Sequence, residues 1–178
     1  MMDKIVLAGF GGQGVMFMGK IFAVSGMVSD LEVCWIPSYG PEMRGGTANC
    51  FVLLSDEEIH SPVIDKADGG IVLNQPSYDK FLDRIKTGGV LVVNTSIVEL
   101  NETRDDITII KVQAIEAANE LGNPTIANMV CLGALLPHLK LTDYNKVEKA
   151  IQEVVGAKRP ELLEINLAAI KKGIEITN

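Results

Sequence analysis

The sequence contains few residues that could bind a metal ion or an iron–sulfur cluster. Its 178 residues include three cysteines, Cys34, Cys50 and Cys131, and two histidines, His60 and His138. Zinc sites and iron–sulfur clusters need several thiolates or imidazoles at short spacing, which these scattered residues do not provide. We therefore expect the chain to hold no metal and no cluster by itself. An odd number of isolated cysteines is typical of reduced, buried thiols in a cytosolic protein.

The chain also lacks the features of a secreted, membrane-bound or nucleic-acid-binding protein. Its first eight residues, Met-Met-Asp-Lys-Ile-Val-Leu-Ala, do not show the basic, apolar and small-residue regions of a signal peptide. No apolar run approaches the roughly 18 residues that indicate a membrane span. The formal net charge of −7 argues against a surface that neutralises phosphates. We expect a cytoplasmic protein with neither a membrane nor a nucleic acid as its partner.

Aromatic residues are also scarce, at 5% of a chain that is 47% hydrophobic. The apolar residues are therefore mostly aliphatic, which suits buried parallel strands covered by helices. The length lies in the usual range for one domain, and no repeat, low-complexity tract or linker divides the chain. Residues 1–178 are thus predicted to form a single domain.

Strands and helices are predicted to alternate along the first two thirds of the chain, and only helices follow. This alternation is typical of βαβ units, so the first two strands should be joined by a right-handed crossover and form a parallel start to the sheet. The predicted fold is a single Rossmann-like, three-layer α/β domain with a mostly parallel sheet and a helical C-terminal third. Strands are expected at 4–8, 32–36, 47–54, 70–73, 90–93 and 107–112, and helices at 15–28, 76–85, 114–121, 128–139, 143–155 and 160–174.

Three local features refine this prediction. The polar turn after the third strand allows residues 59–63 to pair antiparallel with that strand. Gly88-Gly89 is expected to close the helix at 76–85. Asn128 and Asp143 are predicted helix N-caps, because short polar side chains accept hydrogen bonds from the first free N–H groups of a helix; for Asn128, a role at a binding site is the alternative.

A glycine-rich loop links the first predicted strand to the first predicted helix. Its sequence is Gly9-Phe10-Gly11-Gly12-Gln13-Gly14. Backbone N–H groups of such a loop, at the start of a helix, can hold a phosphate. The alternative is that the glycines only permit a tight turn and close packing of the helix on the sheet. The phosphate interpretation gives these candidate cofactor-binding residues: Gly9, Gly11, Gly12, Gln13 and Gly14.

Two side chains near this loop have open roles. Gln13 must satisfy its amide donors and its acceptor, either with a ligand or with a neighbouring loop. Lys20, farther along the helix, either reaches back to a phosphate or is solvated. The glycine spacing would also fit an autonomous NAD-binding Rossmann-type oxidoreductase, but that class expects an acidic residue at the end of the second strand. Here the strand ends at Ile36-Pro37-Ser38, and the nearest acids, Asp30 and Glu32, precede it or begin it.

A second loop, with the sequence Tyr-Gly-Pro-Glu-Met-Arg-Gly-Gly at residues 39–46, follows the second predicted strand. Because carboxyl ends of parallel strands share one edge of a sheet, it should lie beside the glycine loop. Arg44 has a planar fork that suits a phosphate or carboxylate, and Glu42 could orient it or pair with a partner subunit. The alternative is an internal Glu42–Arg44 contact that only stiffens the loop. The candidate interface or active-site residues are Tyr39, Gly40, Glu42, Arg44, Gly45 and Gly46.

Together these two motifs resemble the gamma subunit of 2-oxoacid:ferredoxin oxidoreductases. The resemblance rests on residues 9–15, Gly-Phe-Gly-Gly-Gln-Gly-Val, and on residues 37–49, Pro-Ser-Tyr-Gly-Pro-Glu-Met-Arg-Gly-Gly-Thr-Ala-Asn. It continues through Ser61-Pro62 and Ala67-Asp68 and covers essentially the whole chain.

The resemblance implies a non-autonomous subunit of a larger enzyme. Alpha and beta subunits, and in some complexes a ferredoxin-like delta subunit, would carry thiamine diphosphate, Mg and iron–sulfur clusters. They would decarboxylate a 2-oxoacid, transfer the acyl group to coenzyme A and pass electrons to ferredoxin. The glycine loop and Lys20 would then face coenzyme A as a shared ligand, and residues 39–46 would contact the catalytic subunits. The expected substrate is 2-oxoglutarate or a branched-chain 2-oxoacid, ahead of pyruvate and indolepyruvate.

Overall fold

A six-stranded sheet forms the centre of the computed structural model, which describes residues 1–38, 47–156 and 159–177. The strand order in the sheet is β2-β3-β1-β4-β5-β6. Aliphatic residues fill the central strands, and most are buried on both faces of the sheet, as the composition predicts. The strands are β1 (Met2–Phe10), β2 (Glu32–Ser38), β3 (Thr47–Ser55), β4 (Ala67–Val72), β5 (Ile85–Asn94) and β6 (Thr108–Val112).

Most of the sheet is parallel, as predicted. Strands β1, β4, β5 and β6 pair in parallel, whereas β3 runs antiparallel to both of its neighbours, β1 and β2. The expectation that the sheet begins with a parallel pair of its first two strands is wrong, because β3 is inserted between them. Strand β2 nevertheless runs in the same direction as β1, so both strands end at the same edge. That edge positions the candidate site.

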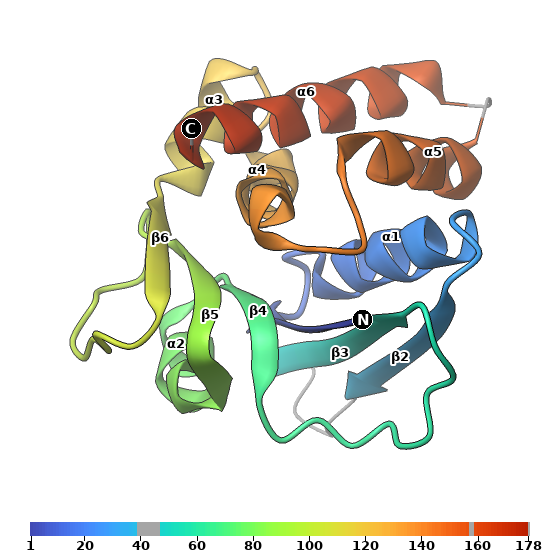
Figure 1. Ribbon diagram of the computed structural model, residues 1–178. Coiled ribbons are helices and arrows are strands. Elements are labelled where there is room, and N and C mark those ends of the chain that lie inside the picture. Colours follow the sequence, from blue (N-terminus) through green and yellow to red (C-terminus); the bar gives the residue numbers. More distant parts are fainter. Residues whose placement is uncertain (39–46, 157–158, 178) are drawn as a thin grey trace.

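Helices cover the two faces of the sheet unequally (Figure 1). One face carries α1 (Val15–Met27), α3 (Ala114–Glu120), α4 (Ala127–Leu135), α5 (Tyr144–Val155) and α6 (Pro160–Thr177). The other face carries α2 (Gln75–Phe81), which packs over β1 and β4. The result is the predicted three-layer α/β domain with a helical C-terminal third. No helix in the described ranges is long and apolar enough to cross a membrane.

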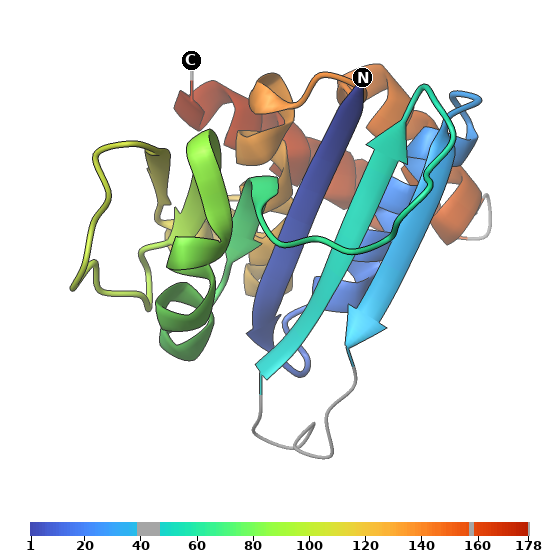
Figure 2. The ribbon, with the colours of Figure 1, turned by 60° about the horizontal axis from the view of Figure 1, so that its bottom comes forward.

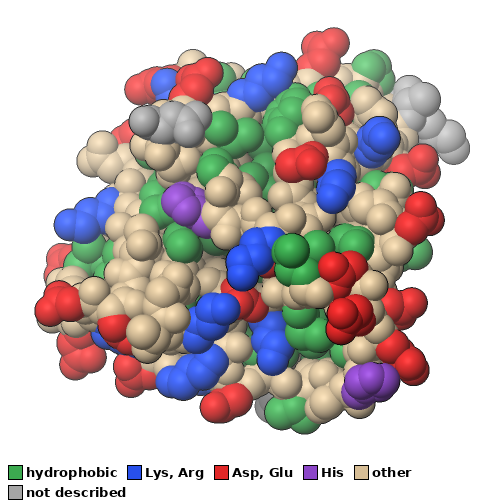
Figure 3. Space-filling view, in the orientation of Figure 1, with side chains coloured by type: hydrophobic (Ala, Val, Ile, Leu, Met, Phe, Trp, Pro, Cys, Tyr) green, Lys and Arg blue, Asp and Glu red, His purple; other side chains and the backbone are tan. Residues whose placement is uncertain are grey.

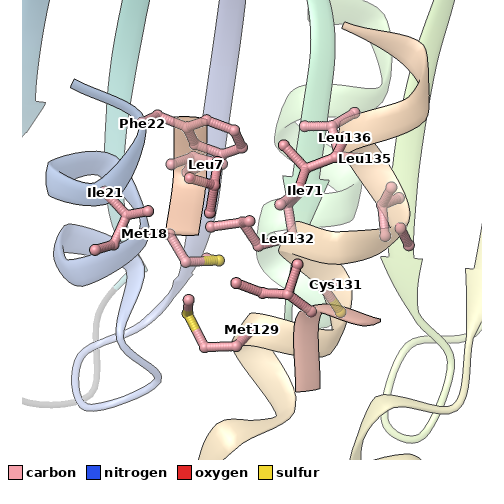
Figure 4. Close-up of a cluster of buried hydrophobic side chains, with 14 of the residues drawn as sticks. Leu7, Met18, Ile21, Phe22, Ile71, Met129, Cys131, Leu132, Leu135 and Leu136 are labelled. Carbon is pink, nitrogen blue, oxygen red and sulfur yellow. The ribbon is translucent and has the colours of Figure 1, made fainter. Parts of the chain in front are cut away.

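The larger core lies between the sheet and helices α1 and α4. Met18 and Phe22 from α1 meet Leu132 from α4 above Leu7 of β1 and Ile71 of β4 (Figure 4). All five side chains are fully buried. Burying one such aliphatic or aromatic side chain contributes about 1.5–3 kcal/mol. This core fixes α1, and therefore the loop that leads into it, against the sheet.

Helices α4 and α6 approach each other so closely that glycine is required on both sides of the contact. A Cβ atom on Gly133 would clash with the backbone carbonyl of Ile170, and one on Gly173 with that of Val130. Because the obstacles are backbone atoms, they cannot rotate away as side chains can. No spacing motif in the sequence predicts this crossing.

The segment between β3 and β4 crosses the outer face of the antiparallel half of the sheet (Figure 2). Residues 59–63 form no strand, so the predicted antiparallel pairing with β3 is wrong. These residues cannot pair with β3 because its backbone N–H and C=O groups are already hydrogen-bonded along both edges, to β1 and to β2. Ile64 of this segment is buried, whereas Val63 is exposed.

Gly88-Gly89 does not close a helix. Helix α2 ends at Phe81, a 3-10 turn follows over Leu82–Arg84, and both glycines lie inside β5. The pairing of β4 with β5 shifts register at this point, and Gly88 has a positive φ of 76° that favours glycine. The predicted N-cap at Asp143 is confirmed, since its Oδ1 accepts from the N–H of Lys146 at 3.0 Å.

Candidate functional site

The glycine loop, residues 9–14, connects β1 to α1 at the carboxyl edge of the parallel strands. Gly12 and Gly14 have positive φ values of 92° and 78°, which other residues rarely adopt. Gly9 is buried, and a Cβ atom there would come within 2.7 Å of the Gln13 Oε1. Gly12 and Gly14 therefore permit the tight turn, and Gly9 and Gly14 permit close packing, whereas phosphate binding by the loop stays a prediction. Gly11 is exposed and leaves the outer side of the loop accessible.

Gln13 closes the glycine loop from within. Its Oε1 accepts from the N–H of Phe10 at 2.6 Å, and its Nε2 donates to the carbonyl of Leu73 at 3.4 Å. Its backbone N–H donates to the Phe10 carbonyl at 3.2 Å. The side chain thus ties the loop to the residue that follows β4. Of the two roles left open by the sequence, the contact with neighbouring backbone is the one the structure shows.

Asn128 reaches the glycine loop from the far end of the sequence. Its Nδ2 donates to the Gly14 carbonyl at 3.4 Å, and the side chain is only 7% exposed. The predicted N-cap role is wrong, because α4 already begins at Ala127 and Asn128 is its second residue. The alternative, a role at a binding site, stays a prediction, and the side chain lies beside the glycine loop. It brings α4 into contact with the loop.

The start of α1 offers backbone donors to an anion. The N-cap Gly14 makes no side-chain capping bond, and the first turn contains no acidic residue. The Gly14 carbonyl already accepts from the N–H of Met18 at 3.0 Å, so the helix is regular from its first turn. Free N–H groups and the helix dipole favour negative charge here. Lys20 is exposed on the second turn, and its reach to a phosphate stays a prediction.

A hollow of about 200 Å³ opens beside the loop and is named the amide hollow. It lies at the carboxyl ends of the neighbouring strands β1 and β4. The chain leaves β1 toward α1 on one face of the sheet, and leaves β4 toward α2 on the other face. Such a switch point in an open α/β sheet is where ligands bind. Every side chain in its lining is uncharged. The lining residues are Gly12, Gln13, Leu73, Asn94, Ile115, Pro124, Thr125, Ala127 and Asn128.

Sequence reasoning missed Asn94 altogether. It ends β5 and is 2% exposed, and its Oδ1 accepts from the N–H groups of Ser96 at 3.2 Å and Ala114 at 3.4 Å. The side chain therefore connects β5 to the start of α3 while lining the hollow. A polar residue that directly follows a buried strand is a signal that could have identified it.

A second hollow lies on the other side of the glycine loop and is mostly apolar. It encloses about 260 Å³ and includes Phe10, Met16 and Phe17 in its lining. Phe10 is 38% exposed, which is unusual for a large aromatic side chain in this protein. The loop is thus flanked by an apolar hollow and an amide-lined hollow.

A larger hollow lies at the opposite, amino edge of the strands. It measures about 610 Å³ and is lined by charged side chains, including Lys4, Asp68 and Lys86. Lys86 is paired with Asp68, whose other oxygen accepts from the N–H of Lys4 at 2.8 Å. These charges largely satisfy one another. On the face in Figure 3, acidic side chains lie around and between the basic ones. We assign the site to the carboxyl edge, where the parallel strands end.

The second loop of the sequence analysis has both ends at that edge. Ser38, the last residue of β2, pairs with Asn49, and Thr47, the first residue of β3, pairs with Phe10 beside the glycine loop. Strand β2 ends without an acidic residue, as the sequence indicates, so the acid that binds a dinucleotide ribose is missing. The candidates between these ends lie outside the described residues, namely Tyr39, Gly40, Glu42, Arg44, Gly45 and Gly46.

The thiols near the site are not reactive groups. Burial raises the pKa of Cys50, which lies under the first residue of α1, to about 11. Burial also raises the pKa of Cys131 to about 12. Both therefore stay protonated near neutral pH, and the thiolate is the nucleophilic form. In the described part of the chain, no group of three or more histidine, cysteine or acidic side chains could hold a metal ion.

The sequence matches the family model described as pyruvate ferredoxin/flavodoxin oxidoreductase over residues 4–176. The chain is 38% identical over 179 residues to the 2-oxoglutarate synthase subunit KorC of Methanocaldococcus jannaschii, covering 99% of this chain and 94% of that protein. It is 34% identical over 174 residues to the ketoisovalerate oxidoreductase subunit VorA of Methanothermobacter marburgensis. That match covers 97% of this chain but only 36% of VorA, so the chain spans about a third of that relative's length.

Two solved structures share the fold over nearly the whole chain. The keto/oxoacid ferredoxin oxidoreductase gamma subunit from Geobacter sulfurreducens aligns with a TM-score of 0.83 and 29% identity, covering 98% of both chains. The 2-oxoglutarate:ferredoxin oxidoreductase from Magnetococcus marinus, with 2-oxoglutarate, coenzyme A and succinyl-CoA bound, aligns with a TM-score of 0.88 and 27% identity. The latter match covers 99% of this chain and 31% of that one.

Proposed function

The chain belongs to the pyruvate ferredoxin/flavodoxin oxidoreductase family, and from that premise we propose that it is the gamma subunit of a 2-oxoacid:ferredoxin oxidoreductase. It works inside a complex and not as an enzyme alone. The observation that carries this proposal is the neutral, glycine-built carboxyl edge, which offers backbone donors but no reactive side chain in the described residues. Such an edge can bind and orient a cofactor, while the chemistry takes place on partner subunits.

Because this chain would bind the cofactor and other subunits would carry out the chemistry, partner subunits are required. Alpha and beta subunits, with a ferredoxin-like delta subunit where one is present, hold thiamine diphosphate, Mg and the iron–sulfur clusters. They oxidise and decarboxylate the 2-oxoacid, and ferredoxin accepts the electrons. This chain completes the cleft in which the acyl group passes to coenzyme A. Residues 39–46 dock against the catalytic subunits, because both ends of that loop lie at the carboxyl edge.

Coenzyme A is the shared ligand of the glycine loop. Its phosphates would lie at the N-terminus of α1, where the first-turn N–H groups have no side-chain cap. The Magnetococcus marinus enzyme, which this chain resembles over 99% of its length, binds coenzyme A and succinyl-CoA. The relatives favour 2-oxoglutarate or a branched-chain 2-oxoacid as substrate, since the KorC and VorA proteins are 38% and 34% identical. The pyruvate synthase subunit PorC of Thermotoga maritima is less similar, at 25%.

A charge placed on the loop tests the contact with coenzyme A. Gly11 is exposed and has no positive φ, so Gly11→Asp adds a carboxylate without backbone strain, and Gly11→Asn adds the same shape without charge. In the reconstituted complex, we expect Gly11→Asp to raise the KM for coenzyme A at least about tenfold through repulsion of the phosphates. Gly11→Asn and the KM for the 2-oxoacid should change little. Equal coenzyme A KM values for the Asp variant and the wild type would reject the contact.

Arg44→Ala distinguishes docking from cofactor binding at the second loop. If the arginine docks the subunit, the complex fails to co-purify with the variant. If it contacts coenzyme A, the complex forms and the KM for coenzyme A rises. Normal assembly together with normal kinetics would leave only the internal contact with Glu42 and would reject both roles.

A further inference from the structure

The amide hollow has the hydrogen-bonding pattern of a base-recognition site. We propose that it binds the adenine ring of coenzyme A while the phosphates lie on the adjacent glycine loop. This inference rests on the proposed function and adds to it a specific place and a specific part of the ligand. It depends on the unused polar groups, the volume and the position of the hollow.

Each of the two buried asparagines has one polar group left for a ligand. The Oδ1 of Asn94 already accepts from two backbone N–H groups, so its Nδ2 is the group that is left to donate. The Nδ2 of Asn128 donates to the Gly14 carbonyl, so its Oδ1 is the group that is left to accept. The hollow thus offers one donor and one acceptor on rigid, buried side chains that are 2% and 7% exposed.

Adenine carries the complementary pair. Its 6-amino group donates and its neighbouring ring nitrogen N1 accepts, which is the same donor–acceptor pattern as the N6/N7 edge that asparagine and glutamine bind in DNA. We assign the 6-amino group to the Oδ1 of Asn128 and N1 to the Nδ2 of Asn94. The remaining lining supplies apolar surface for the two faces of the ring, from Leu73, Ile115 and Pro124. No cationic side chain lines the hollow, so we place the phosphates on the backbone N–H groups at the start of α1 and not between the asparagines.

The volume and the position favour the base over the other end of coenzyme A. At about 200 Å³ the hollow is smaller than the roughly 300–1,000 Å³ of sites that enclose a whole small molecule, so only a compact part of the cofactor enters. The thiol end must reach the acyl group on the partner subunits, so the end that this chain buries should be the one that does not react. Gly12 lines both the amide hollow and the apolar hollow, so phosphates on the loop would sit next to the base.

Fragments of coenzyme A test the proposal in the assembled complex. Adenosine 3′,5′-bisphosphate should compete with coenzyme A, whereas inosine 3′,5′-bisphosphate, which reverses both hydrogen-bonding positions of that edge, should compete at least about tenfold less well. Asn94→Asp keeps the acceptor that binds Ser96 and Ala114 but replaces the donor that faces the ring. We expect this variant to lose most of the preference for adenosine, because the N1–H of hypoxanthine can donate to the new carboxylate.

The outcomes separate this inference from the proposed function. Equal competition by the adenosine and inosine bisphosphates, or an unchanged preference in a folded Asn94→Asp complex, would overturn the adenine site. The adenine site would also be overturned if 4′-phosphopantetheine shifted the amide NMR signals of Ala127 and Ile115 while adenosine 3′,5′-bisphosphate left these signals unchanged. If Gly11→Asp nevertheless raised the KM for coenzyme A, the proposed contact between the glycine loop and the phosphates would still be supported. An unchanged KM in Gly11→Asp would instead remove the phosphate contact, on which this inference rests.

Discussion

Glycine is required at two places in this molecule for different physical reasons. In the glycine loop, Gly12 and Gly14 are needed because their φ values are positive. At the α4–α6 crossing, Gly133 and Gly173 lie in ordinary helix and are needed because a Cβ atom would meet backbone of the other helix. The loop glycines shape the loop that we propose binds coenzyme A, whereas the crossing glycines let two helices approach. Substitutions in the two groups should therefore affect different properties.

The largest effect is expected at the helix crossing. Gly133→Val places branched carbons against the Ile170 carbonyl, which cannot move without displacing α6. We expect a loss of at least about 3 kcal/mol in the free energy of unfolding, measured by urea denaturation. Glu164→Ala, at an exposed position of α6, should change the stability by less than about 0.5 kcal/mol. A Gly133→Val protein of wild-type stability would show that the contact between α4 and α6 is looser than described.

An intermediate effect is expected at Gly14. Gly14→Ala forces a residue with a Cβ atom into a φ of 78° and pushes against the Nδ2 end of Asn128, with an expected loss of about 1–3 kcal/mol. Because Asn128 is a side chain, its truncation should relieve the steric part. A double-mutant cycle of Gly14→Ala with Asn128→Ala should therefore give less destabilisation than the sum of the single variants. Strict additivity would indicate that the backbone conformation alone explains the requirement for glycine.

The smallest of these effects concerns the side chain that closes the loop. Gln13→Ala removes the hydrogen bonds to the Phe10 N–H and the Leu73 carbonyl, each worth about 0.5–1.5 kcal/mol. The thermal midpoint should fall by a few degrees. In the complex, the KM for coenzyme A should rise more than kcat falls, since the loop loses its shape and not a reacting group. A fall in kcat alone, with an unchanged KM, would contradict the role of Gln13 in shaping the loop.

The sequence indicates the loop glycines but not the crossing glycines. The loop shows a fixed spacing between a strand-like and a helix-like segment, which is a local pattern. Gly133 and Gly173 are forty residues apart, and glycine is required at these positions only because α4 packs on α6. Local patterns likewise predict most strands and helices and the cap at Asp143.

Tertiary contacts explain the predictions that are wrong. The insertion of β3 between β1 and β2, and hence the absence of a strand at 59–63, depends on which strands pair. The register shift in β5 likewise decides the place of Gly88-Gly89. The glycine-loop part of the candidate site, Gly9–Gly14, was found from such a local pattern. Asn94 was not predicted, and Asn128 was named only as an alternative, because the fold brings both from distant segments to the loop.

One measurement tests the central claim that this chain completes a larger enzyme. The chain is combined anaerobically with its alpha and beta subunits, and ferredoxin reduction is followed with a 2-oxoacid and coenzyme A, with the chain present and with the chain omitted. The proposed role predicts that coenzyme A-dependent reduction requires the chain, and that the chain alone neither binds NAD tightly nor oxidises any substrate with it. Full activity without the chain, or NAD-dependent hydride transfer by the chain alone, would contradict it.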